Sequence, residues 1–454
     1  QRAEDELIYM LGLIGQIPQA DIDRGHGHLH EIHDQLGLMR HITKWAERIR
    51  SPQEAPTLVS QAIWHATSGR PRPVALECAL DTWAKRSEVA LPDAPLPLPP
   101  ESIDDEAVET AAKILGNAER PIIVLGGGAM DASAEVIKLA EMLEAPVSSY
   151  RRGRGIVPSS HRLAVDMPVG HRLWKDADAV LAVGTRFFIQ NGNWGIDDRL
   201  KVVRVDIDPD EPERFRKPDA ALVGDAAPQL RALIAALARH NRKRASRAGE
   251  LDGHRAWFTE RLSKLEPQLS FLKAIRNALP EDGIFVDEVS QMGFASRVAL
   301  PIEKPRTFLS PGYQDNLGWG FGTALGAKAA MPDRKVLAIA GDGGFMYQVG
   351  ELATAVRHNI AVVVVVFDNG AFGNVKRIQQ ERYGNRLIAS DLQNPDFGKL
   401  ADSFGIASFM ALDARQLEDA LHKAFALNAP ALVWAPHGDV PSPWDLIMMP
   451  KVRG

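Results

Sequence analysis

The chain has 454 residues, of which 45% are hydrophobic and 24% charged, and its formal net charge is −5. This composition is typical of a globular protein of about three domains and excludes a fibrous or low-complexity chain. The weak net charge gives no sign of a nucleic-acid or membrane surface. The longest strongly apolar run, Ala361–Phe367, is too short to span a bilayer. The single cysteine, Cys78, excludes an internal disulfide framework and fits a reducing cytoplasm.

The first predicted strand, Ile8–Ile14, ends at Gly15-Gln16-Ile17-Pro18. A histidine-rich stretch follows, in which a zinc site is one interpretation because imidazole suits Zn²⁺. The alternating spacing favours a plain loop instead, because it cannot point all four rings at one centre without a special fold. The four histidines are His26, His28, His30 and His33.

The rest of the N-terminal region is predicted to contain two amphipathic helices, at Trp45–Arg50 and Pro56–Ser68, and a last strand, Pro73–Leu80. Cys78 lies in that strand, and we expect it to be a small core residue. Ser87–Glu101 carries five prolines and is predicted to be an extended linker.

Strands and helices alternate after this linker, which predicts a parallel sheet. The expected strands are Pro121–Leu125, Ala179–Val183 and Val202–Val205, and the expected helices are Ala107–Leu115 and Ser133–Leu143. The Gly126–Met130 turn suggests a dinucleotide site, but the full glycine spacing and the acidic residue at a later strand end are missing. A structural turn is therefore favoured there.

Two basic stretches are interpreted as solvated surface. Arg151–Gly155 contains three arginines that could bind a phosphate, but we expect an exposed loop. Ala238–Gly249 is predicted to be a second linker. A third domain then begins at Gln268 with a helix to Leu279, a strand at Ile284–Val286, a glycine-rich segment at Tyr313–Ala330 and a late strand at Ala431–Ala435.

The segment Val336–Arg377 carries the strongest pattern in the chain. Val336–Ala340 and Ala361–Phe367 are short apolar runs that predict strands buried on both faces of a parallel sheet. Apolar residues recur at helical spacing between them, so the segment is β–α–β with a right-handed crossover. Asp342 and Asn369 then follow the carboxyl ends of neighbouring strands, where open α/β sheets bind ligands.

The residue types at these strand ends suit a metal and a phosphate. Gly341, Gly343 and Gly344 allow a close backbone approach to a ligand. Asp342 and Asn369 offer hard oxygen ligands for Mg²⁺ or Ca²⁺, with a phosphate completing the shell. A Gly-Asp-Gly alone is also typical of a solvent turn, but the two strands and the 27-residue step to Asn369 favour a site.

These residues resemble the diphosphate-binding motif of thiamine diphosphate (ThDP) enzymes, and Gly350–Ile360 is most similar to the branch that contains acetolactate synthases. The resemblance implies that the side chains of Asp342 and Asn369 and the carbonyl of Ala371 ligate Mg²⁺. Asp368 stands where relatives usually carry the first of two asparagines.

The resemblance also implies an α/β fold of three doubly wound parallel-sheet domains. Residues 1–86 would form the second half of a pyrimidine-binding domain. Residues 106–240 would form a central domain and residues 267–454 the diphosphate-binding domain, with linkers at 87–105 and 241–266.

Further site residues follow from the same resemblance. Ser290, Gln291 and Met292 occupy the positions of a Gly-Gln-His group that contacts the diphosphate, and Met292 cannot donate a hydrogen bond. Leu317 matches the apolar residue that bends the cofactor, although core packing is the alternative for a leucine alone. The carbonyl of Asp315 would accept from the aminopyrimidine.

The implied activity is decarboxylation or carboligation of a 2-oxo acid, in a homodimer or homotetramer with its active site at a subunit interface. The resemblance places the histidine-rich stretch near the cofactor's entrance. FAD binding by the central domain stays open and is not favoured.

The activating glutamate of the family is the one expected residue without a match. Gly15–Pro18 resembles a strand end midway through the first domain, and relatives carry the glutamate in the half-domain before it. Gln1–Glu6 offers no acidic residue in such a context, so we expect the natural chain to extend further. There are two alternatives. One is a non-catalytic or regulatory homologue, and the other is a flavin- or nucleotide-dependent oxidoreductase built on the Gly126–Met130 turn.

Overall fold

A computed structural model describes residues 9–454, so the prediction for Gln1–Glu6 and the residue Ile8 lie outside the described part. The chain divides into two compact units. The first comprises the chain up to Ser102 together with Gly312–Gln314, and the second comprises Ile103–Pro311 and Asp315–Gly454. None of the helices among the described residues is long and apolar enough to cross a bilayer. Ser87–Glu101 forms no helix or strand.

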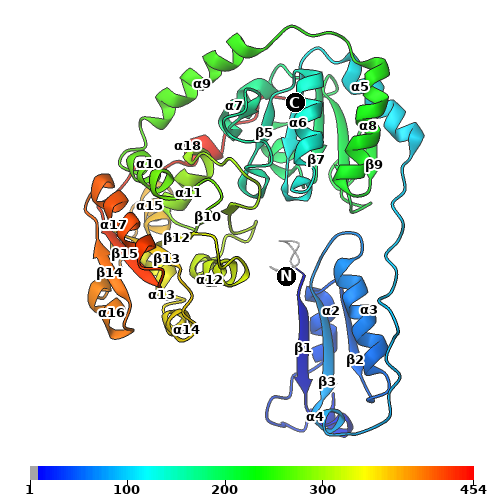
Figure 1. The fold of residues 1–454 in the computed structure, drawn as a ribbon, viewed down its shortest axis with the longest axis vertical. Helices are drawn as coiled ribbons and strands as arrows, with labels where there is room; N and C mark the ends of the chain where they lie inside the picture. Colours follow the sequence, from blue (N-terminus) through cyan, green and yellow to red (C-terminus); the bar gives the residue numbers. More distant parts are fainter. Residues whose placement is uncertain (1–8) are drawn as a thin grey trace. The chain divides into compact units, whose positions relative to one another are not determined.

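The first unit is a three-stranded parallel sheet with the order β1-β3-β2. Its central strand alternates between two faces, because Val74, Leu76 and Cys78 pack with α3 while Ala75 packs with α2. Cys78 is a buried core residue, as predicted. The elements are β1 (Leu11–Gln16), η1 (Gln19–Asp21), α2 (Gln35–Ile42), β2 (Trp45–Ile49), α3 (Ala55–Thr67), β3 (Val74–Ala79) and α4 (Leu80–Trp83). Figure 1 shows the three strands and the helices α2, α3 and α4.

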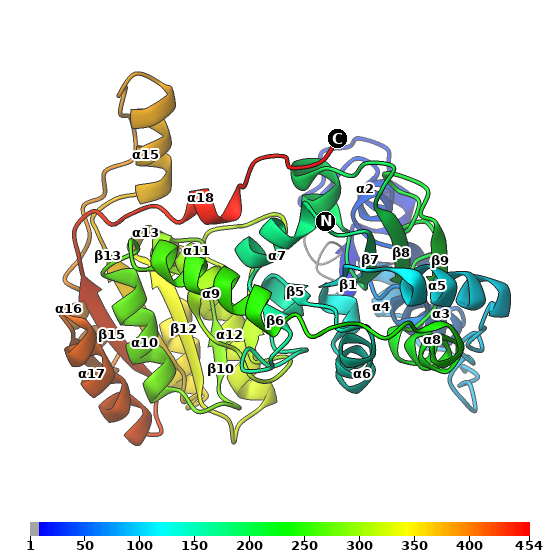
Figure 2. The ribbon, with the colours of Figure 1, turned by 90° about the horizontal axis from the view of Figure 1, so that it is seen from above.

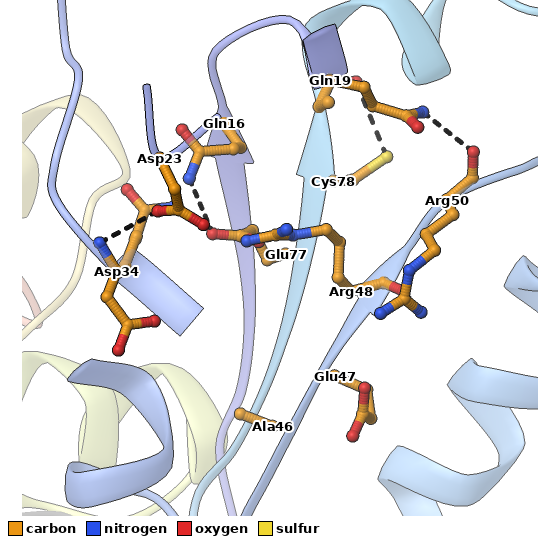
Figure 3. A network of polar contacts seen from close by, with 12 residues as sticks. Gln16, Gln19, Asp23, Asp34, Ala46, Glu47, Arg48, Arg50, Glu77 and Cys78 are labelled. Carbon is orange, nitrogen blue, oxygen red and sulfur yellow. Dashed lines mark hydrogen bonds and ion pairs between the residues drawn. The ribbon is translucent and has the colours of Figure 1, made fainter. Parts of the chain in front are cut away.

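A buried carboxylate ties these three strands together. Glu77 in β3 is 1% exposed. It accepts hydrogen bonds from Gln16 Nε2 at 2.9 Å, Gln35 Nε2 at 3.0 Å and Arg48 Nε. Figure 3 shows Gln16 and Arg48 reaching Glu77 from the strands on either side. The arginine charge and the two amide donors together offset the cost of burying the carboxylate.

The prediction of a helix at Trp45–Arg50 is wrong, because these residues form β2. The strand pairs in parallel with β3, from Trp45 opposite Val74 to Ile49 opposite Cys78. Only Ala46 and Ile49 are buried, and residues three apart share one face of a helix but lie on opposite faces of a strand. Here Ala46 packs with α2 and Ile49 packs with α3, on the two faces of the sheet. The neighbouring strand supplies the backbone hydrogen bonds that decide between a helix and a strand.

The second unit contains two six-stranded parallel sheets. The first, here called the central sheet, has the order β6-β5-β4-β7-β8-β9. Its strands are β4 (Pro121–Leu125), β5 (Val147–Ser149), β6 (Ala164–Val165), β7 (Ala179–Val183), β8 (Lys201–Asp206) and β9 (Ala220–Val223). The helical elements around it are α5 (Asp105–Asn117), η2 (Gly127–Ala129), α6 (Ser133–Leu143), η3 (Arg151–Gly153), α7 (Met167–Trp174), η4 (Ile189–Trp194) and α8 (Ala226–His240).

The strand order of the central sheet reverses between β4 and β7, which is where such sheets bind ligands. The Gly126–Met130 turn lies at this point, and its glycines serve backbone packing. A Cβ on Gly184 would lie 2.4 Å from the backbone of Gly128, and Gly128 N donates to Gly184 O at 3.0 Å. The favoured structural role of the turn therefore has a direct physical reason.

The two basic stretches are more ordered than expected. Arg154 is 5% exposed and donates to the carbonyls of Ser296 and Leu300, so the prediction of a solvated loop at Arg151–Gly155 is wrong. More than half of the linker predicted at residues 241–266 is the helix α9 (Ala248–Leu262), which buries Leu251 and Phe258, whereas residues 241–247 form neither helix nor strand. Arginine stems and guanidinium groups can fill buried sites when carbonyls accept from them, and composition alone does not reveal this.

The C-terminal sheet (β10–β15) has the order β11-β10-β12-β13-β15-β14. Its strands are β10 (Ile284–Val286), β11 (Phe308–Leu309), β12 (Val336–Gly341), β13 (Val363–Asp368), β14 (Ala407–Met410) and β15 (Ala431–Pro436). The helices are α10 (Gln268–Ala278), α11 (Gln291–Ala299), α12 (Gly320–Ala330), α13 (Asp342–Met346), α14 (Glu351–Arg357), α15 (Gly373–Arg382), α16 (Phe397–Ser403), α17 (Ala414–Ala426) and α18 (Trp444–Ile447). The predicted α/β class with parallel sheets is confirmed.

Two apolar cores cover the two faces of this sheet. Leu337 and Ile339 of β12 pack with α10, α11 and α17, whereas Ala338 and Ala340 pack with α12, α14 and α16. The predicted crossover helix between β12 and β13 is present, but it is split into α13 and α14. Figure 2 shows α15 standing away from the sheet, and this helix buries none of its residues.

Gly184→Ala should destabilise the central sheet. Gly184 has a φ of +54°, and its new Cβ would lie 2.4 Å from Gly128. Strain and overpacking together should cost about 2–4 kcal/mol. Thermal melting measures the loss. Gly253→Ala is the control, since that glycine lies in α9 with nothing within 4 Å of a Cβ, and it should keep or raise the melting temperature. Equal melting temperatures for the two variants would contradict this account.

Candidate active site

Three neighbouring strands of the C-terminal sheet end at one edge. β12 lies between β10 and β13, and all three run parallel. The strand order reverses between β10 and β12, so the crevice outside their carboxyl ends is the expected ligand position. Asp287–Gln291 follow β10, Asp342 follows β12 and Asn369 follows β13. The predicted site residues from the three strand ends are thus brought to one edge.

Asp342 is the most constrained residue at this edge. It is 2% exposed, and Asn394 Nδ2 donates to its Oδ2 at 2.7 Å. Burial raises the pKa of the Asp342 carboxyl, and the nearby carboxylate of Asp368 raises it further. No lysine, arginine or histidine within the described residues pairs with it. A bound cation would strongly stabilise the ionised form of a carboxyl group that is buried and has no positively charged partner.

Asp368 holds the strand end in place. Its carboxylate accepts from Asn394 Nδ2 at 2.7 Å, Trp434 Nε1 at 3.0 Å and the backbone of Gly370 at 3.1 Å. One amide of Asn394 therefore bridges the carboxylates of Asp342 and Asp368. Sequence reasoning missed Asn394, because it comes from a loop without a local signal of its own.

The segment after Asp368 contains further oxygen atoms that could ligate a metal ion. Ala371 forms an isolated antiparallel bridge with Asp391. Its two backbone hydrogen bonds run from Phe372 N to Ser390 O and from Leu392 N to Gly370 O, so neither uses the carbonyl oxygen of Ala371. Carboxylate, side-chain amide and backbone carbonyl oxygens are the donor set that Mg²⁺ and Ca²⁺ prefer.

The glycines of the Gly341–Gly344 turn allow other groups to approach closely. A Cβ on Gly343 would lie 2.4 Å from the Phe372 ring. A Cβ on Gly344 would lie 3.4 Å from the side chain of Glu288. The turn is therefore closely packed on the protein side.

Glu288 is a site residue that sequence reasoning missed, although its place directly after a predicted strand was a usable signal. It is 1% exposed and accepts from the backbone of Trp319 at 3.3 Å and of Gly320. Burial raises the pKa of its carboxyl to about 7, although these two hydrogen bonds act against the shift. The side chain thereby fixes the N-terminus of α12.

The three residues that are predicted to contact the diphosphate have different surroundings. Ser290 is the N-cap of α11, and its hydroxyl accepts from Gly293 N at 3.0 Å. The Oε1 of Gln291 is buried without a hydrogen-bond partner among the described residues. Met292 is 1% exposed and belongs to the apolar core, so it has a packing role. Of these three residues, Gln291 is therefore the one whose buried side-chain oxygen could still accept a hydrogen bond.

Asp315 and Leu317 lie in the segment before α12, here called the wedge loop (residues 315–319). Asp315 has a left-handed backbone with a φ of +46°. Leu317 is 36% exposed. A leucine exposed to this degree is poorly explained by core packing, which was the alternative for this residue.

The histidine-rich stretch of the first unit brings two of its four rings together. Asp21 Oδ1 lies 3.6 Å from His26 Nδ1 and 3.5 Å from His28 Nε2. The ligand atoms of these three residues lie within 4.8 Å of one another. His30 and His33 are not part of this group.

Comparisons with known proteins agree with this geometry. Residues 288–435 match the model of the "Thiamine pyrophosphate enzyme, C-terminal TPP binding domain", and residues 108–233 match the "Thiamine pyrophosphate enzyme, central domain". The chain is 32% identical to a "Probable acetolactate synthase large subunit" of Methanocaldococcus jannaschii, over 93% of the chain and 76% of that protein. It is 31% identical to a "Probable 2-ketoarginine decarboxylase" of Pseudomonas aeruginosa, over 92% and 76%.

The chain therefore belongs to the thiamine pyrophosphate enzymes. Within that family it is a ThDP-dependent enzyme of the acetolactate synthase and 2-oxo acid decarboxylase type. These findings favour neither a flavin- or nucleotide-dependent oxidoreductase nor a non-catalytic homologue.

Glu288→Gln should remove a pH-dependent loss of stability. The pKa of Glu288 is about 7 in the folded chain against an ordinary value of 4.5. Its contribution to stability is thus complete below pH 4.5 and is lost as the pH rises through 7. The loss at higher pH is about 3 kcal/mol. Glutamine keeps an oxygen acceptor without titrating.

Melting temperatures measured between about pH 5 and pH 8 test this prediction. They should fall more steeply with rising pH in the native protein than in the Glu288→Gln variant. Parallel curves for the two proteins would contradict the raised pKa.

Proposed function

We propose that this protein decarboxylates a 2-oxo acid, with or without transfer of the remaining carbon unit to a second carbonyl, using ThDP and Mg²⁺. The observation that carries the proposal is the buried carboxylate of Asp342, which has no cationic partner among the described residues. A divalent cation would supply the missing charge, and a diphosphate would complete its shell.

The residues present fit both groups. Asp342, the side chain of Asn369 and the carbonyl of Ala371 would hold Mg²⁺. The backbone of Gly341, Gly343 and Gly344 would contact the diphosphate beside the metal, and Ser290 and Gln291 lie at the adjoining strand end. The unpaired amide oxygen of Gln291 supports a ligand at this position, because the orientation of a glutamine amide can reverse to donate.

The wedge loop would set the shape of the cofactor. Leu317 would press its apolar side chain against the cofactor from below, and the carbonyl of Asp315 would accept from the aminopyrimidine. When bound, ThDP would supply a nucleophilic carbon and a sink for the negative charge that decarboxylation leaves. The protein supplies position and electrostatics.

The chain organisation and assembly are proposed from the same relationship. Residues 106–240 form a central domain and residues 267–454 a diphosphate-binding domain, while residues 1–86 belong to a pyrimidine-binding domain. The activating glutamate would come from that last domain. A homodimer or homotetramer with active sites at a subunit interface, located in the cytoplasm, completes the proposal. We do not propose FAD binding.

Asp342→Ala should weaken Mg²⁺-dependent ThDP binding by about 100-fold or more, because the cation loses its only charged protein ligand. Isothermal calorimetry with ThDP, with and without Mg²⁺, measures the effect. The melting temperature without ligands should stay the same or rise, because a buried carboxylate without a cation is removed. Asp402→Ala removes an exposed carboxylate of the same domain and is the control. Native affinity in Asp342→Ala would refute the proposed metal site.

Leu317→Ala should lower kcat by roughly 10- to 100-fold while ThDP still binds through its diphosphate. Because Leu317 is 36% exposed, the substitution should leave the melting temperature nearly unchanged. Leu412, which is 57% exposed in the same domain, gives the matched control Leu412→Ala. CO₂ release from a panel of 2-oxo acids measures the rate. A variant that keeps its kcat but melts earlier would instead show a packing role.

A further inference from the structure

An arginine of the central sheet reaches the wedge loop. Arg151 lies in η3, directly after β5, and its Nη2 lies 2.7 Å from Asp315 Oδ2. Its Nη1 donates to the carbonyl of Pro311 at 3.0 Å, just before the loop. The Arg151 side chain is 17% exposed and that of Asp315 is 25% exposed, so the contact is largely shielded from water. Shielded ion pairs with hydrogen bonds are the strong ones.

Asp315 is held from a second side by Arg297 of α11. Arg297 Nη1 donates to Asp315 Oδ2 at 3.2 Å, and Nη2 lies 3.0 Å from Oδ1. Arg297 Nε donates to Asp287 Oδ2 at 2.7 Å, at the end of β10. Burial alone would lower the pKa of Arg297, but the carboxylates of Asp287 and Asp315 raise it. The chain of charges therefore alternates in sign from the central sheet to β10.

The two arginines act on a backbone that needs support. The φ of Asp315 is +46°, a left-handed conformation that is uncommon for residues other than glycine. Such a backbone persists where its surroundings hold it in place. Arg151 and Arg297 grip the carboxylate of this residue from two different elements, which fixes the direction of its carbonyl group.

We propose that Arg151 is a positioning residue for the cofactor, which acts from the central sheet by holding Asp315 so that the Asp315 carbonyl faces the aminopyrimidine of ThDP. This inference rests on the proposed function, because it assigns the wedge loop to the cofactor. The central-sheet region would then support cofactor binding through Arg151, and not through its Gly126–Met130 turn.

Arg151 is a better test than Arg297. Arg297 is 2% exposed, and its removal would leave Asp287 buried without its cation. Such a change threatens folding. Removal of Arg151 leaves Asp315 paired with Arg297, so the fold is retained while the grip on the loop is weakened.

The experiment compares Arg151→Gln with the native protein in the presence of Mg²⁺. We expect the dissociation constant of ThDP to rise about tenfold and kcat to fall by a similar factor. The KM for the 2-oxo acid should change little, because Arg151 acts on the loop assigned to the cofactor. The near-ultraviolet circular dichroism of bound ThDP should weaken, since it reports how the protein holds the aminopyrimidine ring. Arg151→Lys, which keeps the charge, should recover part of each effect.

Asp131→Asn is the matched control. Asp131 of the central-sheet region forms an exposed ion pair with Arg306 of the C-terminal-sheet region, at 2.7 and 2.9 Å. This pair joins the same two parts of the chain without touching the wedge loop, so its loss should leave the affinity, the spectrum and kcat at native values. Native values in Arg151→Gln, or an equal loss in Asp131→Asn, would overturn the inference.

A second variant keeps the test decisive if Arg151→Gln fails to fold. Asp315→Asn removes the other partner and should reproduce the weaker binding and altered spectrum, and native values would overturn the inference. The double variant should lose little beyond Asp315→Asn alone, because Arg151 acts through Asp315. If the native protein binds no ThDP, the proposed function fails. If it binds ThDP and only Arg151 proves indifferent, this inference alone fails.

Discussion

A carboxylate held away from water at the carboxyl end of β12 organises the C-terminal sheet. β12 and β13 are buried on both faces, so only their ends are available for polar chemistry. Asp342 lies at that end, and Asn394 ties it to Asp368 at the end of β13. A buried carboxylate with a second carboxylate so close to it is costly without a positive charge. The arrangement of the two carboxylates therefore favours a bound cation between the ends of β12 and β13.

The wedge loop is anchored at both of its ends by side chains from outside it. Arg151 and Arg297 hold Asp315 at the start, and Glu288 binds the backbone of Trp319 and Gly320 at the finish. Leu317 lies between these anchors. A loop fixed in this way loses little entropy when a cofactor binds, which is the structural requirement for a pre-organised site. The anchors come from the central sheet, α11 and β10.

Much of this fold was predictable from its apolar runs. The polar contacts that support the site were not predictable from the sequence. β4, β7 and β10 match their predicted bounds because continuous buried strands leave a clear signal. β2 was missed because its two buried residues have the three-residue spacing of a helix, since the strand is covered on both faces. Arg151 and Arg154 resembled solvated surface, since composition does not show which carbonyls and carboxylates will meet a guanidinium group. Their partners lie more than 100 residues away along the chain.

A crystal structure of the protein with ThDP and Mn²⁺ in place of Mg²⁺ would test the central claim most directly. Anomalous scattering locates the ion without reference to its surroundings. The account predicts one ion bound by Asp342, the side chain of Asn369 and the carbonyl of Ala371, with the diphosphate beside Gly343. An ion bound elsewhere, or ThDP bound at this edge without a metal contact to Asp342, would contradict it.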